Sequence, residues 1–142
     1  MFTRIITTTK EFYEMRQEWE ILQTKDPSTS YYSTYEYVKA WWDVYKEDRN
    51  KRLFIICIYQ GKDIVGIAPL YIEIKKRSIF KWRELRFMGI GDYFGFVLDH
   101  SRNNSQTIIK KIFSCINQHN DKWDRLLLTH IEKNSSLAIY LF

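Results

Sequence analysis

The first apolar pattern in the chain predicts a short strand followed by an amphipathic helix. Residues 2–7 are mostly apolar or β-branched, which favours a strand. Thr8 and Glu11 then form a capping box, in which each side chain can satisfy a free backbone N–H group at the start of a helix. The apolar residues that follow have the spacing of one helical face, and they are Phe12, Met15, Trp19 and Leu22. Because Pro27 cannot continue a helical hydrogen-bond ladder, we expect this helix to end near Lys25.

A second helix is predicted at about residues 33–45. Ser33 and Glu36 form another capping box at its start. The side expected to be buried consists of Val38, Trp41, Trp42 and Tyr45. Since Trp41 and Trp42 are neighbours, they cannot share one helical face. We therefore expect one of them in the core and the other exposed enough to contact a ligand or a partner domain, with Trp41 as the candidate for substrate contact.

The middle of the chain has the pattern of consecutive strands. Residues 53–59 form a continuous apolar run, which is typical of a strand covered on both faces. A turn of hairpin length at 60–63 leads to a partner strand at 64–74. Pro69 cannot donate a ladder hydrogen bond, so we expect a bulge or a sheet edge at that position. Two further strands are expected downstream, at 80–88 and 94–98.

The remaining pattern predicts a helix, a strand and a short helix. The apolar face of the helix at 105–118 is made of Ile108, Ile109, Ile112, Phe113 and Ile116. Residues 125–131 are expected to form a buried strand, and Asn134, Ser135 and Ser136 to cap a short apolar helix at 137–142. This order predicts a single domain over residues 1–142 of the α/β (α+β) class, with a mixed, mostly antiparallel central sheet flanked by helices.

Composition narrows the possible functions only slightly. The chain has 142 residues and a net charge of +5, which favours an anionic partner weakly. The clustered cations are Lys75, Lys76, Arg77, Lys81, Arg83 and Arg86. A solvated hairpin tip is the simpler interpretation of this cluster, and nucleic-acid binding is the alternative. Aromatic residues make up 17% of the chain, which indicates either an aromatic core or stacking against a sugar or a base.

The cysteines and the N-terminus indicate a reduced, cytoplasmic protein. Cys57 and Cys115 lie far apart within apolar runs, so both are expected to be buried hydrophobic side chains. Residues 1–4 do not form a secretion signal, and no apolar stretch has the length of a membrane span. We therefore expect a cytoplasmic location.

Three residues are candidates for chemistry. Asp92 and Tyr93 lie in a glycine-rich turn at a strand end, where polar side chains often face a cleft. The alternative for Asp92 is a carboxylate that caps its own turn. His130 lies near the end of the last predicted strand and could serve as a general base, or it could be a core or edge histidine. His100 and His119 are expected on the surface, and no two histidines are close enough in sequence to suggest zinc.

Four segments of the chain carry a family resemblance. They are residues 35–42 (YEYVKAWW), 61–71 (GKDIVGIAPLY), 87–93 (FMGIGDY) and 123–126 (WDRL). Together they look like the amino-terminal part of the cellulose-biosynthesis-type acetyltransferases, relatives of the FemAB-like transferases in the GNAT superfamily. The resemblance extends over residues 18–142.

This resemblance implies a GNAT-like fold and acetyl-CoA as the acyl donor. Members of the family have two GNAT-like halves, and the present chain matches the first. The resemblance therefore implies that the sheet is incomplete at the C-terminus and that the chain is the N-terminal half of a longer architecture.

The segment that would bind coenzyme A departs from the family pattern. A GNAT domain holds the pyrophosphate on a glycine-containing loop that opens a helix, where free backbone N–H groups meet the phosphates. The corresponding segment here, residues 99–105, contains no glycine and begins with Asp99. We therefore predict no cofactor-binding residues in this chain. The other glycine cluster, Gly89–Gly95, precedes a strand rather than a helix and is expected to form a tight turn.

Besides nucleic-acid binding, which rests on the charge alone, two functions remain open from the sequence. The first is an acyltransferase-related domain that supplies the acceptor side of the cleft for a small-molecule amine or hydroxyl and is not competent alone. The second is a non-catalytic binding or assembly module that retains only the fold. In either case the strand at 125–131 and the apolar segment at 137–142 lack cover, which predicts association with a second copy or with a complementary GNAT-like domain.

Overall fold

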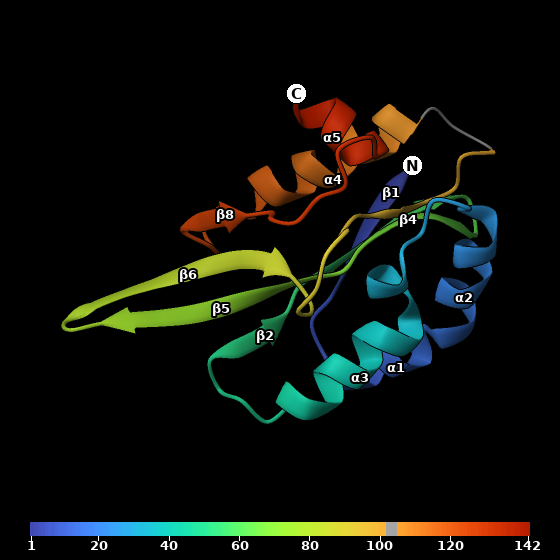
Figure 1. Cartoon of the computed structure of the whole chain (residues 1–142). Coiled ribbons are helices and arrows are strands. Elements are labelled where there is room, and N and C mark those ends of the chain that lie inside the picture. Colours follow the sequence, from blue (N-terminus) through green and yellow to red (C-terminus); the bar gives the residue numbers. More distant parts are fainter. Residues whose placement is uncertain (102–104) are drawn as a thin grey trace.

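The computed structural model describes residues 1–101 and 105–142 and shows a mixed α/β fold (Figure 1). Its strands and helices are β1 (Phe2–Ile6), α1 (Thr9–Glu14), α2 (Arg16–Lys25), the 3-10 helix η1 (Tyr31–Ser33), α3 (Tyr35–Tyr45), β2 (Lys51–Leu53), β3 (Ile55–Gln60), β4 (Asp63–Ala68), β5 (Leu70–Arg77), β6 (Phe80–Phe87), β7 (Val97–Leu98), α4 (Ser105–Gln118), β8 (Arg125–Leu127) and α5 (Ser136–Leu141). The fold class expected from the sequence is confirmed.

The strands form two four-stranded sheets, and the chain crosses from one sheet to the other more than once. The first sheet has the order β1-β3-β4-β7 and the second the order β2-β5-β6-β8. All neighbouring strands are antiparallel except β6 and β8, which are parallel. The chain passes from one sheet to the other at Phe54 and again at Pro69, where the Phe54 N–H donates to the Leu70 carbonyl at 3.0 Å. The strand expected at 64–74 is thus divided at Pro69, and the bulge lies earlier, at Val65.

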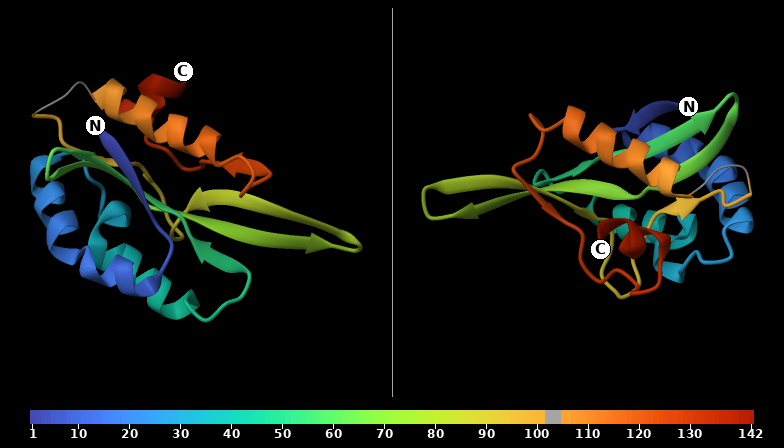
Figure 2. Two further views of the ribbon diagram at one scale, coloured as in Figure 1. Left: turned by 180° about the vertical axis from the view of Figure 1, so that it is seen from behind. Right: turned by 90° about the horizontal axis from the view of Figure 1, so that it is seen from above.

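Helices cover both faces of the first sheet. Helices α1, α2 and α3 lie on one face, and α4 and α5 lie on the other (Figures 1 and 2). Strand β3 contributes alternately to the two resulting cores, with Ile55 and Cys57 facing the three N-terminal helices and Ile56 and Ile58 facing α4. This alternation is the two-residue period of a strand, and it confirms the prediction of a strand covered on both faces. Burial raises the pKa of the Cys57 thiol, which packs as a hydrophobic side chain.

The N-terminal helical segment is broken in a way that its periodicity does not show. The Thr8 cap is confirmed, since its Oγ1 accepts the Glu11 N–H at 3.2 Å. The expected continuous helix divides at Met15, whose N–H donates to the Phe12 carbonyl in a tighter three-residue turn. The predicted cap at Ser33 is wrong by one residue, because Thr34 Oγ1 accepts the Tyr37 N–H while Ser33 belongs to η1.

Both tryptophans of α3 are buried, so the expectation that one of them is exposed is wrong. Trp41 is 9% exposed and Trp42 is 4% exposed. The Trp41 ring packs against Tyr71 of β5, with centroids 4.7 Å apart. The Trp42 Nε1–H donates to Thr9 Oγ1 at 3.0 Å. Helix α3 is therefore enclosed between the sheet and α1 over a wider arc than a single helical face.

The C-terminal elements agree with the sequence in the helices and differ in the strand. Helix α4 has the predicted bounds, and Ser135 caps α5 by accepting the Ala138 N–H at 3.2 Å. The buried strand expected at 125–131 is wrong, because β8 covers only Arg125–Leu127 and is partly exposed. The strand expected at 94–98 is likewise reduced to β7 and one isolated bridge at Phe94.

Tyrosine side chains hold the glycine-rich loop between β6 and β7. The Tyr37 hydroxyl accepts the Ile90 N–H at 2.9 Å and donates to the Ile90 carbonyl. Gly89 has a φ of +123°, which side chains rarely permit. A Cβ atom at Gly91 would lie 2.3 Å from Cε1 of Tyr32. The glycines therefore allow two aromatic rings to approach the backbone closely, and the loop is held in place without a regular strand.

A buried carboxylate connects the end of α2 to β7. Asp26 is 2% exposed, and its Oδ2 accepts the Leu98 N–H at 2.8 Å. Its Oδ1 accepts the Ser28 N–H at 3.0 Å and lies 3.0 Å from Nε2 of His100. These contacts satisfy a backbone donor at the point where the first sheet approaches residues 99–101.

Replacement of this carboxylate should destabilise the fold. We expect Asp26→Ala to lower the free energy of unfolding by about 1–3 kcal/mol, because the buried Leu98 N–H loses its acceptor. Urea unfolding monitored by circular dichroism measures the change. The control is Asp121→Ala at an exposed carboxylate, which should change the stability by less than about 0.5 kcal/mol. Equal losses in the two variants would contradict the role of Asp26.

The packing of Tyr32 on the glycine-rich loop gives a second prediction. Gly91→Ala should cost about 1–3 kcal/mol, because the new methyl group meets a ring that is itself packed against Phe94 and Tyr37. Gly95→Ala is the matched control, since a Cβ at Gly95 has no neighbour within 4 Å. If thermal unfolding shows the same midpoint for both variants, the loop is not held as described.

Candidate functional site

A cavity of about 370 Å³ lies where the glycine-rich loop meets the second sheet. Its wall comes from β5, β6, the loop and the segment after β8. The lining residues are Tyr71, Arg86, Phe87, Gly89, Ile90, Gly91, Asp92, Phe94, Leu127, Thr129 and His130. Asp92 and His130 were separate candidates in the sequence, and the structure places both in this one wall.

A backbone bridge between two parallel segments brings these candidates together. Phe94 and Ile131 form an isolated parallel bridge, and the Phe94 N–H donates to the His130 carbonyl at 2.9 Å. Tyr93 and His130, the residues immediately before the bridge, have φ values of 62° and 58°. Residues other than glycine occupy this left-handed region at a cost on the order of 1 kcal/mol. The chain therefore turns at both positions to direct Asp92 and His130 to the same cavity.

The two candidate side chains have different environments within the wall. The imidazole Nδ1 of His130 lies 3.2 Å from Thr129 Oγ1, so Nε2 is the ring nitrogen left for a ligand. Asp92 is exposed, and its carboxylate accepts no hydrogen bond from the residues that the structure describes. The turn-capping alternative for Asp92 therefore finds no support in these contacts. A carboxylate and an imidazole on one concave surface can bind a cation and accept a proton.

Sequence reasoning missed two residues of the wall, Tyr71 and Arg86. They are cross-strand partners in the β5–β6 hairpin, and such partners project from the same face of a sheet. Burial, with a smaller contribution from Glu73, raises the pKa of Tyr71 to about 12. Its phenol is therefore a hydrogen-bond donor at neutral pH. Counting outward from a two-residue turn at positions 78–79 would have placed the pair, but the sequence alone did not identify that turn.

The other two candidates lie outside this cavity. Tyr93 lines a separate space, and its carbonyl accepts the Ser30 hydroxyl at 2.7 Å. Trp41 lies behind Tyr71, and its Nε1–H is buried without a hydrogen-bond partner among residues 1–101 and 105–142. Trp41 thus contacts the cavity only through the Tyr71 ring.

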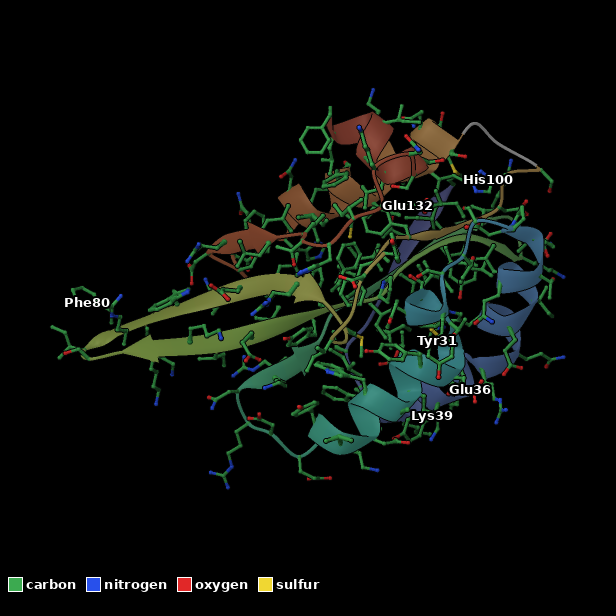
Figure 3. The ribbon with its side chains drawn as sticks, in the orientation of Figure 1. Tyr31, Glu36, Lys39, Phe80, His100 and Glu132 are labelled. Atoms are coloured by element: carbon green, nitrogen blue, oxygen red, sulfur yellow. The ribbon has the colours of Figure 1, made fainter. Side chains whose placement is uncertain are left out.

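The space on the opposite side of the bridge is almost filled. It is enclosed by residues 28–33, 93–100 and 132–137 and measures about 30 Å³, enough for about one water molecule. Phe96, Leu98 and Leu137 contribute apolar side chains to its wall. His100 and Glu132, labelled in Figure 3, come from two of the three segments that enclose it. The side chains of these segments leave little room between them.

The described part of the segment before α4 does not fit a diphosphate. The Asp99 N–H donates to the Val65 carbonyl at 2.8 Å, and the Ser101 N–H donates to Asp99 Oδ1 at 2.9 Å. Both amides are thus already used within the protein, and the buried Asp99 carboxyl group lies 3.7 Å from the Lys25 ammonium group. Positions 102–104 lie outside the described residues, and the expectation for them rests on their lack of glycine.

In the part of the chain that the structure describes, no three His, Cys, Asp or Glu side chains gather into a group that could hold a metal ion. No helix among residues 1–101 and 105–142 is both long and apolar enough to cross a bilayer.

Comparison with known proteins identifies the fold but gives no sequence relative. No protein-family model matches the chain, and no curated protein is significantly similar to it. Among solved structures, the ribosomal-protein-alanine N-acetyltransferase of Brucella melitensis biovar Abortus 2308 has a TM-score of 0.54 at 10% identity, over 99% of this chain and 88% of that chain.

Two proteins of Bacillus halodurans are similarly close in structure. The tetramutant of BH1408 has a TM-score of 0.52 at 12% identity, over 99% of this chain and 90% of that chain. A transcriptional regulator of strain C-125 has a TM-score of 0.51 at 16% identity, over 99% and 89% of the two chains. At such low identity the likeness shows the fold alone, and that fold is the one found in the GNAT acetyltransferases.

Proposed function

We propose that this chain is an acyltransferase-related domain that supplies the acceptor side of the cleft for transfer of an acetyl or other acyl group to an amine or hydroxyl. The observation that carries the proposal is the shared cavity of Asp92 and His130, directly beside the bridge where the two parallel segments separate. The GNAT fold supports acetyl transfer as the general chemistry.

The side chains of the wall have complementary roles in this proposal. Asp92 holds a protonated amine by a charge-assisted hydrogen bond. His130 first accepts a proton from this ammonium group, or from a hydroxyl acceptor, through Nε2, which frees the lone pair that attacks the acyl carbon. The bond from the acyl carbon to the donor then breaks, and the donor's leaving group departs, as a thiolate if the donor is a thioester. The Tyr71 phenol and the Arg86 guanidinium orient the polar groups of the acceptor. Most of the rate enhancement would come from fixing the acceptor in this geometry.

We also propose that this chain does not bind the acyl donor without a second domain. Three observations support this: the nearly filled space behind the bridge, the internal use of the Asp99 and Ser101 amides, and the buried Asp99 carboxylate. The same observations agree with a first half of a cellulose-biosynthesis-type architecture, whose second half holds acetyl-CoA.

A partner for this domain is part of the proposal. Among the described strands β8 pairs only with β6, and Ile139 on α5 is 65% exposed. An open strand edge and an apolar side chain next to the filled space support docking of a complementary GNAT-like domain or of a second copy in the cytoplasm.

The alternative is a non-catalytic binding or assembly module. The nearly filled space behind the bridge favours it, because the fold is retained while the position of the acyl chain is lost. In that case the Asp92–His130 cavity would bind a ligand without transferring a group to it.

The donor prediction is tested by calorimetric titration of the chain with acetyl-CoA at low salt. We expect no saturable heat at micromolar concentrations, because the described residues offer no set of free amides to the diphosphate. Micromolar binding would contradict the assignment of the donor to a partner.

The acceptor prediction is tested with a panel of primary amines and amino sugars, whose binding is measured by ligand-observed NMR. Asp92→Asn should weaken binding about tenfold, the value of one charge-assisted hydrogen bond. Asp121→Asn removes the same charge at a remote exposed site and should leave binding unchanged. If both substitutions weaken amine binding equally, the effect comes from the net charge of the protein, and the assignment of the amine site to the Asp92 cavity is wrong.

A further inference from the structure

The β5–β6 hairpin extends beyond the rest of the protein. It points away from the helices in all three views (Figures 1 and 2). Strand β2 pairs with β5 only at residues 71–73, and β8 pairs with β6 only at residues 84–86. Backbone hydrogen bonds to Asn50 and Asp124 extend this support to Ile74 and Arg83, so residues 75–82 are a two-stranded ribbon without further strand partners in the described structure. Such a ribbon is only marginally stable by itself. Its exposed side chains therefore indicate what it could contact.

The end of this ribbon exposes large apolar side chains. Ile79 in the turn is 90% exposed, and Phe80 beside it is 69% exposed. Phe80 is labelled at the outer end of the hairpin in Figure 3. Two adjacent side chains of this size at the outermost point of a soluble domain form a small hydrophobic tip.

Cations stand directly behind the tip on both faces of the ribbon. Lys76 pairs with Lys81, and because cross-strand partners share a face, both project to one side. Lys75 and Arg77 alternate with Lys76 and project to the other side. The sequence holds no acidic residue between Glu73 and Glu84. Lys76, Arg77 and Lys81 take part in no ion pair with the described residues, whereas Lys75 lies 3.9 Å from Glu73. The prediction of a basic hairpin tip is thus confirmed for Lys75, Lys76, Arg77 and Lys81, whereas Arg83 pairs with Asp124 and Arg86 lines the cavity described above.

We propose that this hairpin tip docks on an anionic lipid bilayer, with Ile79 and Phe80 inserted at the headgroup boundary and the four cations at the level of the lipid phosphates. A strand rises about 3.4 Å per residue, so Arg77 lies about 3 Å, Lys76 and Lys81 about 7 Å, and Lys75 about 10 Å from the end of the ribbon. Interfacial peptide segments enter a membrane by about 5–10 Å. The cations would therefore meet the phosphates when the apolar tip is inserted.

The arrangement favours a membrane over a nucleic acid. Headgroups surround an inserted tip on all sides, which suits cations on both faces of the ribbon. A nucleic acid would be contacted mainly by one face, and its phosphates would meet Ile79 and Phe80 before they met the cations. Nucleic-acid binding is therefore an outcome that the experiment must distinguish.

Vesicle co-sedimentation tests this inference with the full chain. The chain should bind vesicles of phosphatidylcholine mixed with phosphatidylserine, lose binding as salt is raised, and not bind phosphatidylcholine alone. The double variant Lys76→Gln/Lys81→Gln should bind about 25-fold more weakly, since each surface cation contributes about fivefold. The matched control is Lys110→Gln/Lys111→Gln on α4, which removes the same charge elsewhere and should bind as the unmodified chain does.

Insertion of Ile79 and Phe80 is tested separately, by fluorescence and by vesicle binding. Phe80→Trp should show a blue-shifted fluorescence increment on the anionic vesicles, because the ring leaves water on insertion, and Ile79→Ser/Phe80→Ser should lose binding. All these positions are exposed or at the end of the ribbon, and an unchanged circular dichroism spectrum verifies folding. Equal weakening by the two lysine pairs, absence of vesicle binding at low salt, or retention on a nucleic-acid column in place of vesicles would each overturn the proposal.

Discussion

The hydrogen bond from the Phe94 N–H to the His130 carbonyl connects the segment before β7 with the segment after β8, and so joins the two sheets. It joins two parallel segments that otherwise belong to different sheets, since β7 pairs with β4 and β8 pairs with β6. On one side of this contact the wall opens into the cavity of Asp92 and His130. On the other side the side chains close the space to about 30 Å³. The open cavity and the nearly closed space thus lie on opposite sides of one backbone contact.

Aromatic side chains pack around this contact and hold the neighbouring segments in place. Tyr32 and Tyr37 hold the loop that leads to Phe94, and the glycines at 89 and 91 give the rings room. Trp41 packs behind Tyr71 and so stabilises the opposite wall of the cavity. An aromatic-rich core, one of the two interpretations of the composition, accounts for these residues. The aromatic side chains near the site are therefore mostly structural, and they position a small number of polar groups.

Local signals in the sequence predicted local structure well. The cap at Thr8, the bounds of α4 and the cap at Ser135 depend on residues within one or two turns of each other, so they are visible in the sequence. Asp92 was singled out by its glycine-rich turn, and His130 by the end of a predicted strand that the structure shortens to Arg125–Leu127. Their common cavity was not predictable, because it depends on a bridge between segments far apart in the chain.

The sequence predictions that were wrong concern positions whose structure depends on tertiary contacts. The break at Met15 is a change of hydrogen-bond pattern that keeps the apolar residues on one side, so periodicity cannot reveal it. Trp41 and Trp42 are both buried because the sheet and α1 enclose α3 from two directions. The expected strand at 125–131 has an apolar sequence, yet only three of its residues find a partner strand. Tyr71 and Arg86 were missed because hairpin register decides which residues face each other.

The central claim is that this chain receives the acceptor but does not by itself hold the acyl donor. Backbone amide NMR of the ¹⁵N-labelled chain tests it most directly, with a primary amine and acetyl-CoA added in turn. The account predicts that the amine shifts the signals of Asp92 and His130 and that acetyl-CoA leaves those of Ser101 and Ser105 in place. Shifts at Ser101 and Ser105 with acetyl-CoA, together with unchanged signals at Asp92 and His130 with the amine, would contradict it.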